Sequence, residues 1–231
     1  MGILQSSLYT EFTWSRNHVA ASGAKKVYLL VEYHNTVATT SKDIVHSRRI
    51  AEQVQLHLQL GTGVRLNAWY GCRAEVLNEL NYSIWLGSLL EGEAKHMVLE
   101  FDCAPHPSGN HPIVTVLCTY KDATHNQIIL PSQTISLQFS NHTSVFVKKM
   151  DRRVEKCLKL LQNPFVLEKA LRAFEGGNLK RGEEMIRRRA DEMLTQAIRL
   201  EDIDYLREAE ILYALSRTFL STYLVDRLAN V

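Results

Sequence analysis

The stretch Val54-Gln-Leu-His-Leu-Gln-Leu60 determines the fold class of the first part of this chain. Its aliphatic side chains alternate strictly with glutamine and histidine, and a period of two places alternate side chains on opposite faces of a β-strand. The pattern therefore predicts a half-buried strand, with the four aliphatic side chains towards a core and His57 and the two glutamines away from it.

Similar short apolar segments lie on both sides of this strand, and turn-forming residues separate them. They cover residues 8–14, 27–33, 66–70, 82–86, 96–103, 113–120, 126–130 and 134–139. Several short strands with such punctuation are typical of an antiparallel β-sandwich, which we place at residues 1–142. One segment, 41–53, departs from the pattern, and there we expect a short helix capped by Ser41 or Asp43.

From residue 143 onward the apolar period becomes helical, which predicts a C-terminal α-helical bundle at residues 143–231. Asn163-Pro164 ends a first helix that begins near residue 147 and starts a second one, which stops at Gly176-Gly177. A third helix is expected at about 180–200, and a fourth from Asp202 or Asp204 to about residue 228. The chain is therefore expected to be an α+β protein.

Composition excludes several classes of protein. The 231 residues are 45% hydrophobic and 23% charged, with a formal net charge of +2, which is typical of a globular domain and not of a disordered chain. The longest apolar runs fall short of the ~18 residues of a membrane span. The first residues lack the basic and apolar regions of a secretory signal, so we expect a cytoplasmic protein without membrane contact.

The side chains that could carry chemistry are few. Cys103, His106 and His111 lie close in sequence beside Asp102, and they could form a soft metal site. A structural zinc site needs four ligands, and no further cysteine or histidine follows nearby. We therefore expect no metal and no cofactor, and in the absence of a catalytic motif we expect no enzymatic activity. An uncharacterised enzyme using these three residues remains the weakest alternative.

Two basic clusters lie on the predicted helices. They comprise Lys148, Lys149, Arg152 and Arg153 in the first helix, and Lys180, Arg181, Arg187, Arg188 and Arg189 in the third. Acidic residues such as Glu183 and Glu192 follow or precede them at the spacing of helical ion pairs, which favours a solvated ion-paired surface. Contact of Arg187, Arg188 and Arg189 with the phosphates of a nucleic acid is the second hypothesis for function.

The fourth helix is apolar on more than one face. Tyr213, Phe219 and Tyr223 add large rings to this surface. Exposed apolar patches of that size mark interfaces, which predicts a homodimer or a protein partner that covers the helix. The alternative is that the fourth helix lies at the centre of the bundle and is covered within one chain.

Several segments resemble bacterial von Willebrand A domain-containing proteins, often called calcium-activated chloride channel homologues. The resemblance rests on Val54-Gln-Leu-His-Leu-Gln-Leu-Gly-Thr-Gly-Val-Arg-Leu66, on residues 84–100 and on residues 114–122. Residues 23–32 and Gly176-Gly-Asn178 are also similar to that family. The resemblance implies the β-sandwich and helical region that flank the von Willebrand A domain.

The von Willebrand A domain itself is absent from this chain. It would belong between Tyr33 and about Ile44, where about ten residues stand instead, and no Asp-x-Ser-x-Ser motif occurs. The family's Mg²⁺ role is therefore not carried over. The resemblance and the lack of catalytic motifs together predict a non-enzymatic protein-interaction or scaffold module.

Overall fold

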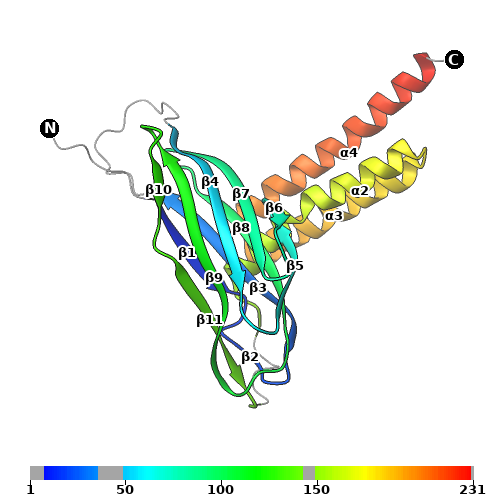
Figure 1. The fold of residues 1–231 in the computed structure, drawn as a ribbon. Helices are drawn as coiled ribbons and strands as arrows, with labels where there is room; N and C mark the ends of the chain where they lie inside the picture. Colours follow the sequence, from blue (N-terminus) through cyan, green and yellow to red (C-terminus); the bar gives the residue numbers. More distant parts are fainter. Residues whose placement is uncertain (1–7, 36–48, 143–148, 230–231) are drawn as a thin grey trace. The chain divides into compact units, whose positions relative to one another are not determined.

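The computed structural model describes residues 8–35, 49–142 and 149–229, with the side chains of the last helix described as far as Phe219. Packing divides the chain into two compact units, Met1–Leu158 and Lys159–Val231. Strands dominate the first unit and helices form the second (Figure 1). No helix in the described part of the chain is long and apolar enough to cross a membrane.

The strands of the first unit form two sheets. A four-stranded sheet has the order β1-β3-β8-β5, and a seven-stranded sheet has the order β2-β11-β9-β4-β7-β6, with β10 paired to β9. The four-stranded sheet consists of β1 (Leu8–Trp14), β3 (Ala24–Asn35), β5 (Val64–Tyr70) and β8 (Lys95–Cys103). The seven-stranded sheet consists of β2 (His18–Ala20), β4 (Arg49–Leu60), β6 (Arg73–Val76), β7 (Asn81–Leu90), β9 (Gly109–Asp122), β10 (Gln127–Ile129) and β11 (Gln133–Ser140).

The expected α+β class is confirmed, and one detail of strand direction differs. All described strand pairs are antiparallel except β11 with β2, which run parallel. The three-residue strand β2 follows directly after β1 in sequence but pairs in the other sheet. As an edge strand, β2 runs parallel to β11. The period of apolar residues within a strand does not reveal the direction of its neighbour.

One apolar core lies between the two sheets. Leu56 and Leu58 of β4 belong to it and are almost fully buried, as are Leu29 of β3 and Phe101 of β8. Because β4 is flanked by β7 and β9, its inward side chains are enclosed from both sides as well as from the facing sheet. The predicted half-buried strand at 54–60 is confirmed, with its glutamines and His57 outside the core.

The prediction of a helix at residues 41–53 is wrong for the part that the structure describes. Residues 49–53 belong to β4, and residues 41–48 lie outside the described residues. Gln53 has a left-handed backbone with φ of 52°, at a point where the register with β7 and β9 shifts. Such a bulge breaks the strict alternation of side chains, and this explains why the period-two pattern begins only at Val54.

Four helices follow the sandwich: α1 (Arg152–Leu161), α2 (Asn163–Glu175), α3 (Leu179–Leu200) and α4 (Ile203–Ala229). The first begins later than residue 147, because the Asp151 carboxylate accepts hydrogen bonds from the backbone N–H groups of Arg153 and Val154, at 2.9 and 3.2 Å. This is the N-cap arrangement. The predicted ends of α2 and α3 agree with the structure.

Helices α2, α3 and α4 pack around a second apolar core. Phe174, Ile186, Met193 and Leu212 are almost fully buried there. Gly182 makes the close approach of α2 and α3 possible: a Cβ atom at this position would lie 2.9 Å from the Phe174 ring and from the Ala170 carbonyl oxygen.

Candidate functional site

The sequence-predicted Cys/His loop does not converge on a common point. The rings of His106 and His111 lie 5.0 Å apart and both contact Phe139. The two ring nitrogens of His106 lie 2.7 and 3.2 Å from carbonyl oxygens of Ala104 and Thr62. Cys103 is buried, and burial raises the pKa of its thiol to about 12. These side chains therefore serve the packing of this end of the sandwich.

The rings predicted as an interaction surface on α4 are engaged within the helical unit where they are described. Phe219 stacks on Phe174, with ring centroids 5.3 Å apart. The Tyr213 hydroxyl donates a hydrogen bond to Asp191 on α3, which raises the pKa of the phenol. The side chain of Tyr223 lies outside the described residues.

The three consecutive arginines of the basic cluster on α3 are paired with acidic neighbours. Arg187 lies 3.4 Å from Glu183, and Arg188 lies 3.7 Å from Glu192. Arg189 is mostly buried, donating to Asn163 and to the Lys159 carbonyl oxygen as well as to Glu192. Arg189 is therefore a structural side chain, whereas Arg188 projects into solvent with 86% of its side chain exposed.

A cluster of charged groups lies on the outer side of the four-stranded sheet. Glu11, Glu32 and His34 place their ligand atoms within 4.8 Å of one another, the sole such set of metal-ligand type in the described part of the chain. The Arg153 guanidinium pairs with Glu32 and lies 3.6 Å from Glu11. His96 lies 3.3 Å from Glu32. Arg153 supplies the positive charge that a metal ion would otherwise bring, so the cluster secures the start of α1 to the sheet.

The outer side of the seven-stranded sheet differs from this cluster because it carries no formal charge at its centre. On β9, β4 and β7, cross-strand pairing aligns three rows of outward side chains. The rows are Thr119–Gln55–Trp85, Leu117–His57–Ser83 and Thr115–Gln59–Asn81. We call these nine residues the neutral face. Charged residues stand at its margins, with Glu52 and Lys121 at one end and with Arg73 and Glu75 on β6, where they pair with Trp85 and Ser83.

The side chains of the neutral face differ in how far they are bonded to one another. Gln55 donates to the Ser83 hydroxyl, and the Thr115 hydroxyl lies 3.2 Å from that of Thr134 on β11. His57 and Gln59 form no side-chain hydrogen bond with any residue that the structure describes. Trp85 is 44% exposed. The face therefore offers free polar groups and one large ring to solvent.

A groove of about 520 Å³ opens at one end of the neutral face, beside the turn between β6 and β7. It is lined by His57, Leu58, Gln59, Leu77, Asn78, Asn81, Tyr82, Thr115, Leu117 and Ser132. The turn is fixed because Asn78 Oδ1 accepts hydrogen bonds from the backbone N–H groups of Leu80 and Asn81, at 3.0 and 2.9 Å. The volume of the groove is within the ordinary range of ligand sites.

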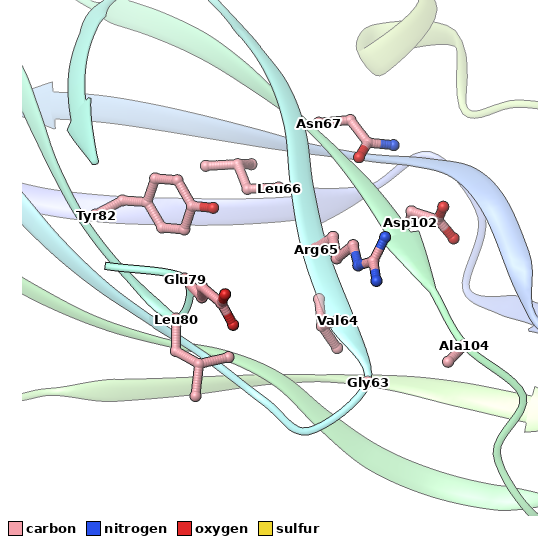
Figure 2. Close-up of a pocket in the computed structure, with 10 residues that line it drawn as sticks. All are labelled: Gly63, Val64, Arg65, Leu66, Asn67, Glu79, Leu80, Tyr82, Asp102 and Ala104. Carbon is pink, nitrogen blue, oxygen red and sulfur yellow. The ribbon is translucent and has the colours of Figure 1, made fainter. Parts of the chain in front are cut away.

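A second pocket lies at the edge of the sandwich and is charged. Figure 2 shows Arg65 on β5, Asp102 on the neighbouring β8 and Glu79 from the β6–β7 turn, with Tyr82 and Leu66. Arg65 and Asp102 are cross-strand partners. The pocket thus holds charges of both signs at a sheet edge, and it selects for no single class of charged ligand.

The sequence alone did not reveal the neutral face, because this face combines residues from strands that are far apart in the sequence. The alternation of β4 correctly places Gln55, His57 and Gln59 outside the core. That Thr119 and Trp85 lie beside Gln55 depends on the sheet register. The signal that could have found it is the absence of charge at the outward positions of three predicted strands.

Comparison with known proteins supports the fold. No protein-family model and no curated protein sequence matches the chain. A solved structure described as von Willebrand factor type A from Catenulispora acidiphila is 15% identical with a TM-score of 0.50, over 65% of this chain and 37% of that one. The ArnB paralogue VWA2 from Sulfolobus acidocaldarius (12% identity, TM-score 0.41) matches over 74% of this chain and 42% of its own length. A non-cellulosomal cohesin from Archaeoglobus fulgidus (11% identity, TM-score 0.40) matches over 60% of this chain and 96% of its own length.

The chain thus spans less than half the length of the Catenulispora protein. At this identity the likeness concerns the fold alone. The fold of this chain is related to that of von Willebrand A domain-containing proteins. The sequence resemblance named the same group of proteins.

Proposed function

We propose that this chain is a non-enzymatic interaction module that binds a protein partner through the neutral face. The observation that carries the proposal is the alignment of nine uncharged outward side chains across three strands, with Trp85 exposed among them. The central parts of protein interfaces are depleted of charged residues and enriched in aromatic ones, with a polar rim around them. Glu52, Lys121 and Arg73 supply such a rim.

The thiols of the chain are not activated as nucleophiles. Burial raises the pKa values of Cys72, Cys103 and Cys118 to about 12, and that of Cys157 to about 11. A thiol acts as a nucleophile in its ionised form, and reactive cysteines have lowered pKa values. In this proposal the module corresponds to the β-sandwich and helical segments that flank the von Willebrand A domain in the bacterial proteins that the sequence resembles.

The proposal is tested by placing a charge on the neutral face. Thr119→Glu adds a carboxylate at the β9 end of the row Thr119–Gln55–Trp85, and Ser108→Glu adds the same charge on an exposed loop away from that face. Affinity-tagged wild-type and variant chains are used to capture partners, which are identified by mass spectrometry. We expect a partner retained by the wild type and by Ser108→Glu but lost by Thr119→Glu. Equal retention by the two variants, or no partner for the wild type, would contradict the proposal.

A further inference from the structure

We propose that the neutral face recognises a neutral oligosaccharide carried by the partner. This inference rests on the proposed function in one respect, the assignment of the neutral face as the binding surface. It adds the chemical class of the group that is bound: sugar rings that stack on Trp85 and place their hydroxyl groups against the side chains of the adjoining groove.

The position of Trp85 fits the apolar side of a sugar ring. The indole is 44% exposed and lies on the outer side of β7, between Gln55 of β4 and Arg73 of β6 in register. The face of an aromatic ring carries partial negative charge. The C–H groups on one side of a pyranose ring carry partial positive charge, so the two surfaces attract when they lie flat against each other.

The polar groups that line the groove match the hydroxyl rim of a sugar. Amide, hydroxyl and imidazole side chains each include donors and acceptors, as a sugar hydroxyl does. His57 and Gln59 reach the groove without a side-chain partner in the described residues, and Ser132 and Asn81 line it as well. An incoming ligand can therefore bond to His57 and Gln59 without first breaking internal hydrogen bonds, whereas Asn81 Nδ2 already donates to Asn78 Oδ1 at 2.9 Å.

The absence of charge selects against other ligands. A phosphate-bearing or acidic polymer needs cations, and the nine residues of the neutral face include no lysine or arginine. A basic segment needs carboxylates, which are also absent from these positions. An amphipathic helix needs a continuous apolar stripe, whereas Trp85 and Leu117 are separated by polar side chains. A neutral ligand with many hydroxyl groups satisfies all of these conditions.

The dimensions favour a chain of sugars over a single ring. Asn81 and Trp85 lie on the outer side of β7 and span about 13 Å at about 3.3 Å per residue, with Ser83 between them only 2% exposed. The groove at the Asn81 end adds about 520 Å³. The indole and the groove can therefore hold different rings of one oligosaccharide.

The experiment titrates the 231-residue chain with neutral 1,4-linked oligosaccharides of about four to six units built from glucose, mannose or xylose, whose units keep a vicinal diol at C2 and C3. Binding is followed by tryptophan emission and by calorimetry. Trp14 and Trp69 pack into the core, so the exposed Trp85 dominates any change caused by surface binding. We expect saturable binding of at least one oligosaccharide. Trp85→Ala should weaken it at least about tenfold, the equivalent of one good aromatic contact, and Gln59→Ala should weaken it by a smaller factor.

Two controls separate the neutral face from other surfaces. Arg65→Ala alters the charged edge pocket and should leave the affinity unchanged. Raising the salt concentration from about 50 to 500 mM should also change the affinity little, because no ion pair is involved. If no oligosaccharide binds, or if Trp85→Ala binds as well as the wild type, the inference is overturned.

The outcome for the proposed function is read independently. Partner capture is repeated after periodate treatment of the partner, which cleaves vicinal diols of its sugars. Loss of capture after periodate, together with inhibition by the bound oligosaccharide, supports the inference. If Thr119→Glu abolishes capture while periodate does not, the neutral face is a protein interface and the oligosaccharide inference fails. If Thr119→Glu has no effect, the assigned surface itself is wrong.

Discussion

Truncation of Leu58 is expected to destabilise the sandwich far more than truncation of its sequence neighbour His57. Leu58 is 2% exposed, and its backbone pairs with Tyr82 on β7 and with Val116 on β9. Strands on both sides hold this position in place, so the surrounding structure can close only part of the space that Leu58→Ala leaves. We expect a loss of about 2–5 kcal/mol in the free energy of unfolding, with the central strand placing it in the upper part of that range.

His57→Ala is the matched control. The imidazole lies on the opposite side of the same strand and makes no side-chain hydrogen bond with the described residues, so its removal should cost no more than about 0.5 kcal/mol. Both variants are unfolded in urea and followed by tryptophan emission, because Trp14, Trp69 and Trp85 all lie in the first unit. Circular dichroism at 222 nm follows the helices separately, since two units need not unfold together. Equal losses for the two variants would refute the assigned register of β4.

Three further predictions concern the helices, the charged cluster and the thiols. Gly182→Ala should destabilise the helical unit by about 1–3 kcal/mol, against the usual helix preference for alanine, because the new methyl group meets the packed Phe174 ring; circular dichroism should show the loss, while the urea midpoint of tryptophan emission stays unchanged. Arg153→Met should cost about 1–3 kcal/mol, because it leaves the Glu32 carboxylate buried without its partner; the value is below that for a fully buried pair because the Arg153 side chain is 54% exposed. A second change, Glu32→Gln, should recover part of that loss, and no recovery would argue against the ion pair. Burial raises the thiol pKa values to about 12, so the unfolded chain releases these protons first and the free energy of unfolding should fall as the pH rises from about 8.5 towards 12. Cys103→Ala should reduce that slope, and an unchanged slope would show that other groups cause it.

The sequence predicts those elements whose signals are local. The alternation at 54–60 locates the central part of β4, and Asn163-Pro164 and Gly176-Gly177 locate the ends of α2. The same local reasoning failed at residues 49–53, where a bulge hides the strand period. It also began α1 too early, because the Asp151 cap is a stronger start signal than the apolar period before it.

The candidate site depends on contacts that no local pattern contains. β4 pairs with β7 and β9, and the residues that meet on the neutral face lie tens of residues apart in sequence. Of the rings chosen on α4 from their apolar character, Phe219 packs against Phe174 of α2. Apolar character alone does not separate a side chain that packs within its unit from one that binds a partner.

Both edge strands of the seven-stranded sheet, β2 and β6, are short, and short edge strands affect resistance to aggregation. β2 has three residues and β6 has four, and β6 carries Arg73 and Glu75. Open sheet edges can recruit further strands and seed fibrils, and short or charged edge strands oppose that growth. In the seven-stranded sheet, strand addition is therefore opposed at both edges, while the uncharged flat side of the same sheet stays accessible.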